Sequence, residues 1–392
     1  MFVQAHTSVD REVHATAERE LGATCYPAVY NRQQVKTVAI AIPSLHRPDL
    51  TARCIEFLQK QTLSPGEWEI VVIENEAQPD KVLPDPLPPN TRRIELATNE
   101  GTTGSINRAV AETGSRYILL LNNDVELEPD YIAKLLAAFD TDLKLGFAVG
   151  KLLRATERDR LDGAGDAMLM AGGAYRLGHL DFDHGQFDQA GPALAGCGAA
   201  VLYRREAFLA SGGLDPEFFA YLDDLDLALR AQLVGYTGAY VPGAVAYHVG
   251  SATLGQPLHP RVVEYITRNQ IYLLIKDYPR AVFLRLLPRI VVYQFLWMMS
   301  AARRGGAGPA TFPVPPQGSA GAYFRGLAAA FRNRSSMRKK GRELMAKRRI
   351  GDAEFLQRLR ESERQIYDWQ QSLPADARSS LLKFYFRLFG KT

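Results

Sequence analysis

Acidic and amide side chains follow one strongly apolar segment directly. Residues 117–121 read Tyr-Ile-Leu-Leu-Leu, and Asn122, Asn123 and Asp124 come next. A carboxylate beside a second polar group can coordinate a hard divalent cation, which in turn can hold a diphosphate. A plain turn at the end of a strand, capped by Asp124, needs the same residue types. The spacing alone leaves both interpretations open.

A second acidic group opens a segment with the apolar spacing of a helix. Asp223, Asp224 and Asp226 stand at the start of residues 223–234. Carboxylates in the first turn of a helix can satisfy free backbone N–H groups and interact favourably with the helix dipole. A carboxylate directed into a cleft can instead act as a general base that takes a proton from an attacking hydroxyl. Both roles fit these residues.

Two further motifs carry weaker signals. His248 follows another apolar segment and can be a metal ligand, although a single histidine is more often structural. Gly101, Gly104 and Asn107 begin a helical segment, where backbone N–H groups suit a phosphate or a ribose edge. Their spacing is neither that of a dinucleotide-binding fingerprint nor that of a P-loop.

The apolar pattern predicts the elements that position these residues. Continuous apolar runs predict buried strands at 38–43, 69–74, 92–97 and 117–122. Helical patterns alternate with them at 48–61, 101–112 and 130–139. This alternation is typical of an α/β fold with a mostly parallel sheet that helices cover on both faces. Ligands of such sheets bind at the carboxyl ends of the strands, where the polar residues described above stand.

The remainder of the body has a looser pattern. Residues 146–200 are rich in glycine and predict only short strands and a flap. Beyond them, we expect strands at 198–206 and 238–249 and helices at 223–234 and 261–276.

Composition limits the class of protein. The chain has 392 residues, 46% of them hydrophobic and 23% charged, which excludes a disordered or low-complexity protein. Three cysteines without metal-ligand spacing favour a reducing compartment. We expect no secretory signal, and the longest charge-free apolar stretch near the C-terminus, 290–302, is shorter than the roughly 20 residues of a membrane span.

The net charge of +4 is unevenly distributed. Residues 281–349 contain fourteen Lys and Arg and one acid, Glu343, so this segment carries +13 and the rest of the chain −9. Apolar and basic helical patterns occupy 281–302, 321–349 and 352–371. Such a division favours different partners for the two parts.

Taken in order, the motifs resemble a family 2 glycosyltransferase with a GT-A fold, of the bacterial rhamnosyltransferase-like kind. The resemblance covers about residues 36–280 and rests on VAIAIPSLHRP, VVIENEA, NEGTTGSINRA, YILLLNNDVEL, GGLDPEFFAYLDDLDLALRAQLVGY, YHVGSAT and RNQIYLLIKDYP. It implies a Rossmann-like, mostly parallel central sheet at 36–280, after an N-terminal extension at 1–35 and before a basic helical region at 281–392.

The resemblance also implies roles for single residues. Asp124 and His248 would hold a divalent metal, Mg²⁺ or Mn²⁺. Asp224 would be the general base, and Asp223 would help to position the acceptor. The nucleotide-sugar site would comprise Pro43, Ser44, Arg47, Glu74, Asn75, Gly101, Asn107 and Asn122. Two features depart from the family pattern: Asn-Asn-Asp replaces Asp-x-Asp, and Glu74 stands where an aspartate is commoner.

The implied reaction is a single displacement that inverts the anomeric centre of a sugar. The metal would neutralise the leaving nucleoside diphosphate, and the base would activate a hydroxyl of the acceptor. The resemblance favours rhamnose or another deoxysugar in the donor and a lipid-linked or cell-surface glycan as the acceptor. A sugar nucleotidyltransferase would need a Lys/Arg-rich nucleotide loop, which the sequence lacks. A non-catalytic, glycan-binding or scaffolding relative is disfavoured because Asp124, Asp224 and His248 are all present.

The basic segment predicts a membrane partner. Phe295 and Trp297 stand on an apolar helix with Arg285 and Arg289, and a polybasic stretch follows. Apolar burial combined with attraction to anionic lipid is typical of an interfacial anchor. We therefore expect a cytoplasmic protein, peripheral on the inner face of the cell membrane through 281–349. The same helices also suit a homodimer interface, and no module for nucleic acid is visible.

Overall fold

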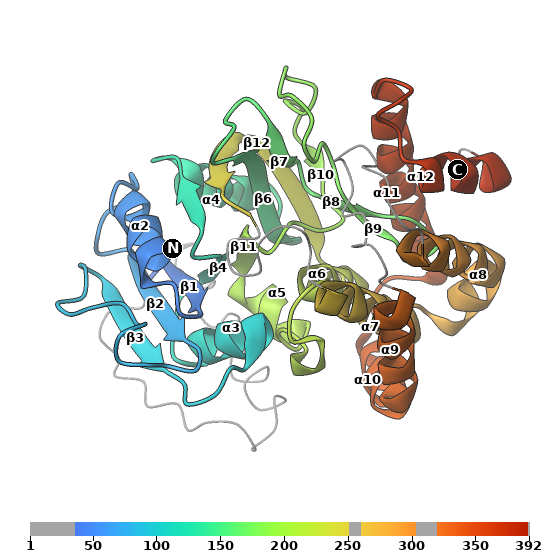
Figure 1. Cartoon of the computed structure of the whole chain (residues 1–392). Helices are drawn as coiled ribbons and strands as arrows, with labels where there is room; N and C mark the ends of the chain where they lie inside the picture. Colours follow the sequence, from blue (N-terminus) through green and yellow to red (C-terminus); the bar gives the residue numbers. More distant parts are fainter. Residues whose placement is uncertain (1–35, 251–259, 303–319, 391–392) are drawn as a thin grey trace, which may run out of the picture.

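A computed structural model describes residues 36–250, 260–302 and 320–390, so the predicted N-terminal extension lies outside the described residues. A ten-stranded sheet forms the centre of the molecule, and helices surround it (Figure 1). Along its main path the strands follow the order β10-β12-β6-β11-β4-β1-β2-β3. Four of the seven neighbouring pairs on this path are parallel, which gives a mixed, mostly parallel sheet.

The parallel part of the sheet matches the strands predicted from the sequence. It comprises β1 (Val38–Ser44), β2 (Trp68–Glu74), β3 (Thr91–Glu95) and β4 (Tyr117–Leu121). Their carboxyl ends lie at one edge, because all four strands run in the same direction.

The other part of the sheet corrects one prediction. β6 (Leu145–Arg154) is a ten-residue strand inside the sheet, within the region for which the sequence predicted only short strands and a flap. It pairs with β11 (Ala200–Arg204) and with β12 (Thr237–His248). Gly150 of this strand is required by a close approach, since a Cβ there would lie 2.2 Å from the carbonyl oxygen of Ala244.

Helices cover both faces of the sheet, as predicted. One face packs against α2 (Pro48–Leu58) and α4 (Tyr131–Thr141) through alternate side chains such as Ile40. The opposite face packs in part against α3 (Gly101–Ala111), where Ala41 meets Ala109. Successive side chains of a strand point to opposite faces, which explains why β1 needs apolar residues at every position from Val38 to Ile42.

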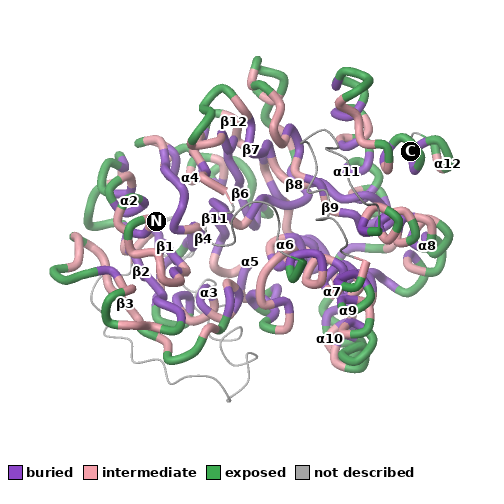
Figure 2. The backbone as a smooth tube through the Cα atoms, in the orientation of Figure 1, coloured by how far each residue is buried: buried purple, intermediate pink, exposed green. Residues whose placement is uncertain are grey.

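The C-terminal region is helical, as expected. It comprises α8 (Arg280–Ala302), α9 (Ala320–Arg332), α10 (Arg334–Lys347), α11 (Asp352–Ser372) and α12 (Ser380–Phe389). These helices follow α7 (Pro260–Lys276), and they gather at one side of the sheet (Figure 1). Trp297 and Phe355 belong to the same buried apolar cluster as Phe147 of β6 and Tyr203 of β11. The region therefore shares its core with the sheet, and Figure 2 shows buried segments in both parts.

α8 agrees with the apolar helical pattern at 281–302. It is a continuous helix of 23 residues and contains the charge-free stretch 290–302. Within the described chain it is the one helix that length and composition would allow to cross a bilayer. A buried helix of a soluble protein can meet the same criterion, and α8 does bury Tyr293 and Trp297 in the protein core.

A buried ionic cluster joins α6 (Asp223–Leu233) to the C-terminal helices. Lys276 of α7 is 2% exposed, and its Nζ lies 2.5 Å from Asp226 and 2.7 Å from Asp215. Arg230 pairs with Asp226 one turn along α6, and Lys340 of α10 pairs with Asp215. α6 is thereby held against α7, and the segment before α6 is held against α7 and α10.

Candidate active site

The carboxyl ends of β1 and β4 are joined by a short hydrogen-bonded chain. The Asn123 amide donates to Thr51 Oγ1 at 3.1 Å, and Thr51 Oγ1 donates to Ser44 Oγ at 3.1 Å. Thr51 lies on α2 and was not singled out from the sequence. The turn that precedes Asp124 is thereby fixed against the end of β1.

Asp124 and His248 meet because β5 (Val125–Leu127) pairs with the end of β12. His248 Nε2 lies 3.3 Å from Asp124 Oδ1, and both residues are buried. On the other side of the ring, His248 Nδ1 lies 2.8 Å from Asp162 Oδ2. Arg176 donates to the same Asp162 oxygen at 2.7 Å.

This arrangement explains the electrostatics of the group. Burial alone would lower the pKa of His248, but Asp162 and Asp124 raise it to about 9. Burial would raise the pKa of Asp124, but His248 brings it below its ordinary value. Asp162 is likewise ionised, because Arg176 and His248 outweigh the effect of burial and lower its pKa. The chain of four groups therefore alternates in charge from Arg176 to Asp124.

The same geometry suits a divalent cation, which would take the place of the proton on His248 Nε2. A carboxylate that accepts from one ring nitrogen fixes the tautomer of a histidine and leaves its second nitrogen to a metal. Here Asp162 engages Nδ1, so Nε2 is the nitrogen on the side of Asp124. One imidazole nitrogen and one carboxylate oxygen are a donor pair that Mg²⁺ and Mn²⁺ accept in proteins.

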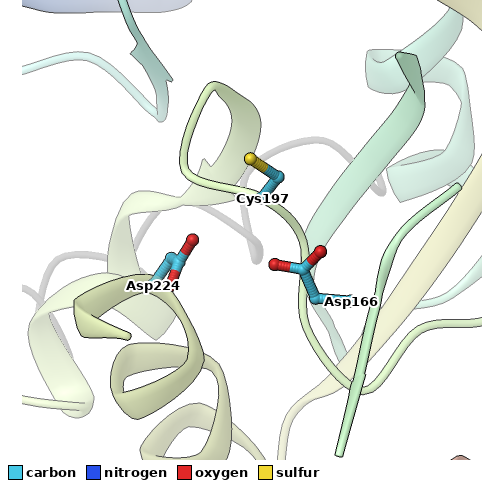
Figure 3. Close-up of side chains that lie close together, drawn as sticks. All are labelled: Asp166, Cys197 and Asp224. Carbon is cyan, nitrogen blue, oxygen red and sulfur yellow. The ribbon is translucent and has the colours of Figure 1, made fainter. Parts of the chain in front are cut away.

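Asp224 stands at the beginning of α6, where its carboxylate is held by backbone groups. Oδ2 accepts from the Gly198 N–H and Oδ1 from the Leu225 N–H, both at 2.8 Å. Figure 3 shows that Asp166 and Cys197 approach Asp224 from other segments of the chain. The ligand atoms of these three residues all lie within 4.8 Å of one another.

Asp166 adds a second carboxylate beside Asp224. It lies on β8 (Asp166–Met168), and its Oδ1 is buried without a hydrogen-bond partner. Burial raises its pKa to about 7, opposed by Arg176 and assisted by the charge of Asp224. Arg176 lies 3.8 Å from Asp166 and also bonds Asp162. This arginine therefore links the Asp124–His248 group to the carboxylates around Asp224.

Several predicted nucleotide-site residues have partners inside the protein. Asn75 donates to Ser105 Oγ and accepts from the Glu100 N–H. Asn107 bonds both the N–H and the carbonyl oxygen of Leu214, and thus fastens α3 to the segment before α6.

Gly101 has a steric reason to be glycine. Its φ is +71°, and a Cβ there would lie 2.3 Å from the Phe219 carbonyl oxygen. The start of α3 can approach the segment before α6 only because this side chain is absent.

Other predicted residues keep polar atoms that a nucleotide can use. Glu74 accepts the Leu83 N–H with Oε1, whereas its buried Oε2 has no partner. Arg47 is paired with Asp49 beside the end of β1, and the charge of Asp124 acts on it. Pro43 lies near the end of β1. The Asn122 N–H donates to the Ala199 carbonyl oxygen.

The sequence alone did not reveal Asp162, Asp166 and Arg176. They lie in residues 146–200, where short strands give no clear periodicity. Pairing of β7 (Leu161–Gly163) with β6, and of β8 with β9 (Ala174–Arg176), brings them to the site. The segment Leu-Asp-Gly-Ala-Gly-Asp at 161–166, which places two aspartates in a glycine-rich stretch, was the only local sign of these site residues.

Asp223 leads to a prediction about pH. Burial, and then the charge of Asp224, raise its pKa to about 8 from an ordinary value of 3.8. Between these values the folded chain keeps a proton that the unfolded chain loses, so this group makes stability fall as pH rises. We expect Asp223→Asn to remove this contribution, which is at most about 1.4 kcal/mol per pH unit. Denaturant unfolding of both proteins between about pH 5 and about pH 8 measures this contribution to stability.

The matched control for this measurement is Asp140→Asn, because Asp140 is exposed on α4, far from α6 in sequence. The control variant should follow the wild type at every pH. Parallel curves for the wild type and Asp223→Asn would show that Asp223 is ionised in the folded protein throughout.

Comparison with solved structures supports the fold. A structure of GalNAc-T7 with UDP, GalNAc and Mn²⁺ aligns with a TM-score of 0.53 at 13% identity, covering 68% of this chain and 52% of that one. At this identity the likeness concerns the fold, and it confirms the predicted GT-A architecture.

Comparison with curated sequences gives distant relatives. An N-acetylglucosaminyl-diphospho-decaprenol L-rhamnosyltransferase of Mycobacterium tuberculosis is 27% identical over 196 residues, which cover 43% of this chain and 62% of the relative. The O-antigen biosynthesis protein RfbC of Myxococcus xanthus is 27% identical over 54% of this chain and 17% of its own. The uncharacterized protein y4gI of Sinorhizobium fredii is 25% identical over 62% of this chain and 28% of its own. The chain thus spans less than two thirds of the length of each of these relatives.

The family model described as "Glycosyltransferase like family 2" matches residues 36–263, which is more than half of the chain. This range contains β1 to β12 and every residue of the site described above. The chain therefore belongs to family 2 of the glycosyltransferases.

Proposed function

We propose that this chain is an inverting glycosyltransferase in which Asp224 is the general base for an acceptor hydroxyl. The observation that carries the proposal is the position of its carboxylate. Backbone N–H groups of Gly198 and Leu225 orient it. Its charge acts on Arg176, which also bonds the Asp162 carboxylate beside His248. A single displacement requires a base that is held in place for the acceptor hydroxyl, and an oriented carboxylate can fill this role.

The proton of the acceptor hydroxyl passes to Asp224 as the oxygen attacks the anomeric carbon. The bond from that carbon to the diphosphate oxygen breaks as the new bond forms, and the nucleoside diphosphate leaves with the bonding electron pair. The neighbouring Asp166, whose pKa is raised to about 7, offers a second acceptor for a hydrogen bond from the sugar. Asp223 and Asp166 bring carboxyl groups close to the base from different elements.

On the donor side, we assign the nucleoside to the end of β2. Glu74 Oε2 is a buried acceptor without a partner, which suits an N–H group of a base. Arg47 stands near the charge of Asp124 and suits a phosphate.

We further propose that Asp124 and His248 hold a divalent metal, Mg²⁺ or Mn²⁺, on the diphosphate. The metal would neutralise charge on the leaving group. Within the protein, Asp162 keeps His248 in one tautomer, and Arg176 in turn holds Asp162. The fit rests on this donor set and its supporting carboxylate.

The sugar and its acceptor are proposed from relatives. The mycobacterial relative is a rhamnosyltransferase that acts on a diphospho-decaprenol-linked sugar. We therefore propose rhamnose or another deoxysugar in the donor and a lipid-linked or cell-surface glycan as the acceptor. A sugar nucleotidyltransferase or a non-catalytic glycan-binding protein would have no use for a base at Asp224.

Replacing the base tests the central proposal. Asp224→Asn cannot take the proton, so we expect transfer of the sugar to slow by roughly 10²- to 10⁴-fold. Binding of the nucleotide-sugar, measured by calorimetry across a panel of donors, should stay within a few-fold of wild type. Asp140→Asn on α4 is the control and should transfer sugar normally. Near wild-type transfer by Asp224→Asn would refute its role as base.

Replacing Asp162 tests the metal site without an activity assay. Asp162→Asn weakens the partner of His248 Nδ1, so we expect Mn²⁺ to bind about 10- to 100-fold more weakly. Mn²⁺ titration followed by electron paramagnetic resonance measures the affinity, with Asp140→Asn as the control. Unchanged Mn²⁺ affinity would show that Asp162 does not support a metal ligand.

We also propose that the C-terminal helices place the protein on the cytoplasmic face of the cell membrane. One stripe of α8 exposes large apolar side chains, at Leu284, Leu287, Val291, Phe295 and Met299. The opposite stripe is buried in the core. Exposed apolar residues in such a row are costly in water and mark an interaction surface.

A paired substitution tests this surface. Val291 and Phe295 are 59% and 56% exposed, so Val291→Gln with Phe295→Gln should preserve folding while weakening binding to anionic vesicles at least tenfold. Leu143→Gln is the control, since Leu143 is 87% exposed in the turn after α4. Vesicle sedimentation measures binding. If the pair instead converts a dimer to a monomer in light scattering and leaves vesicle binding unchanged, the surface is a homodimer interface.

A further inference from the structure

A cavity of about 250 Å³ lies between α11 and α12, away from the candidate active site. Three of its lining residues are basic and none is acidic; the lining comprises Tyr367, Gln370, Gln371, Arg378, Leu382, Lys383, Phe386 and Arg387. The cavity therefore combines a positive charge with aromatic and apolar walls.

The three basic side chains keep donors for a ligand. None of them forms an ion pair with another described residue. Arg378 donates to the carbonyl oxygens of Leu373 and Gln371 and to the Gln371 side chain, which uses three of its five N–H groups. Lys383 donates to the Ala375 carbonyl oxygen.

Gln370 supplies an independent sign of a ligand. This residue is 2% exposed, and its Oε1 accepts from the Ser379 N–H at 2.9 Å. That bond fixes the orientation of the amide, because a backbone N–H needs an acceptor. The opposite atom, Nε2, is buried and has no partner. A buried donor without a partner costs free energy, and Gln370 lines the cavity, so an acceptor that reaches Nε2 from the cavity would remove this cost.

The surface of α12 indicates the kind of molecule that carries the acceptor. Phe384 and Leu388, one turn apart, are 50% and 53% exposed. Lys383 and Arg387, also one turn apart, form the adjacent stripe, and Leu382 and Phe386 lie on the buried side. A helix with an exposed apolar stripe beside a basic stripe is suited to the boundary between lipid headgroups and acyl chains.

α12 packs directly against α8, which carries the exposed apolar stripe described above. The Tyr293 and Tyr385 rings lie 6.3 Å apart, and Arg289 lies over the ring of Phe389. The cavity thus belongs to the helical region that we propose for the membrane surface (Figure 1).

We propose that this cavity binds the phosphate group of an anionic membrane lipid. Arg378, Lys383 and Arg387 supply the positive charge, and Gln370 Nε2 donates to a phosphate oxygen. The inference rests on the proposed membrane association and adds a defined headgroup site to it.

The test uses three full-length variants that each lower the net charge by one. Arg387→Gln removes an exposed cavity cation, and Gln370→Glu replaces the buried donor by an acceptor while keeping Oε1 for Ser379. Lys60→Gln is the control, because Lys60 is exposed in the turn after α2. Figure 1 shows α2 and α12 at opposite ends of the molecule. Binding is measured by sedimentation with vesicles of phosphatidylcholine and a minor fraction of phosphatidylglycerol. Circular dichroism verifies folding of each variant.

We expect Arg387→Gln and Gln370→Glu to bind about fivefold or more weakly than wild type, and Lys60→Gln to bind within about twofold. Equal losses in all three variants would overturn the proposal, because diffuse charge would then explain the binding. Wild-type protein that does not bind vesicles would refute the membrane association itself.

A second arm separates a lipid from a soluble anion. Inorganic phosphate is added to the wild type and to Arg387→Gln, and thermal unfolding is followed. Stabilisation of the wild type alone, with unchanged vesicle binding by the variant, would show a site for free phosphate and overturn the assignment to lipid. Weaker vesicle binding by the variant, with no effect of free phosphate on either protein, supports the proposal.

Discussion

The site depends on Lys276, an ammonium group buried between the carboxylates of Asp226 and Asp215. Buried charges are tolerated only when they are paired closely, so the elements that carry these three residues have little freedom to move apart. Asp226 lies two residues after Asp224 on α6. The ion pair between Lys276 and Asp226 therefore helps to set the position of the proposed base. Burial and the charge of Asp226 raise the pKa of Asp277, beside them, well above its ordinary value.

Arg176 plays a comparable part between the two halves of the site. It bonds Asp162, which orients His248, and it lies near Asp166 beside Asp224. In the proposed reaction, the anionic diphosphate of the sugar donor and the carboxylate that accepts the proton would lie close together. A fixed guanidinium between them reduces the repulsion that such an arrangement creates. The β8–β9 hairpin that supplies Arg176 is consequently part of the site rather than a peripheral loop.

Much of this organisation could be predicted from sequence, and the exceptions have physical causes. Ile40 and its neighbours reveal a buried strand because both faces of the sheet are covered, and Asp124 and His248 stand out at strand ends. β6 was missed because Gly146 and Gly150 resemble loop residues, although Gly150 is needed where Ala244 approaches. Asp162 and Arg176 were missed because strand pairing, not local pattern, brings them to His248. The fold and the motif residues were thus accessible, whereas the residues that orient them were not.

The packing of the C-terminal helices against the sheet fixes where the site lies relative to these helices. Lys340 of α10 pairs with Asp215, and residues of α8 and α11 share one core with β6 and β11. Within the described residues, the helices that we propose to face lipid pack into the same core as α6. On a bilayer, the site would therefore be held at a fixed distance from the membrane surface. An acceptor would then be selected partly by how far its hydroxyl projects above the lipid headgroups.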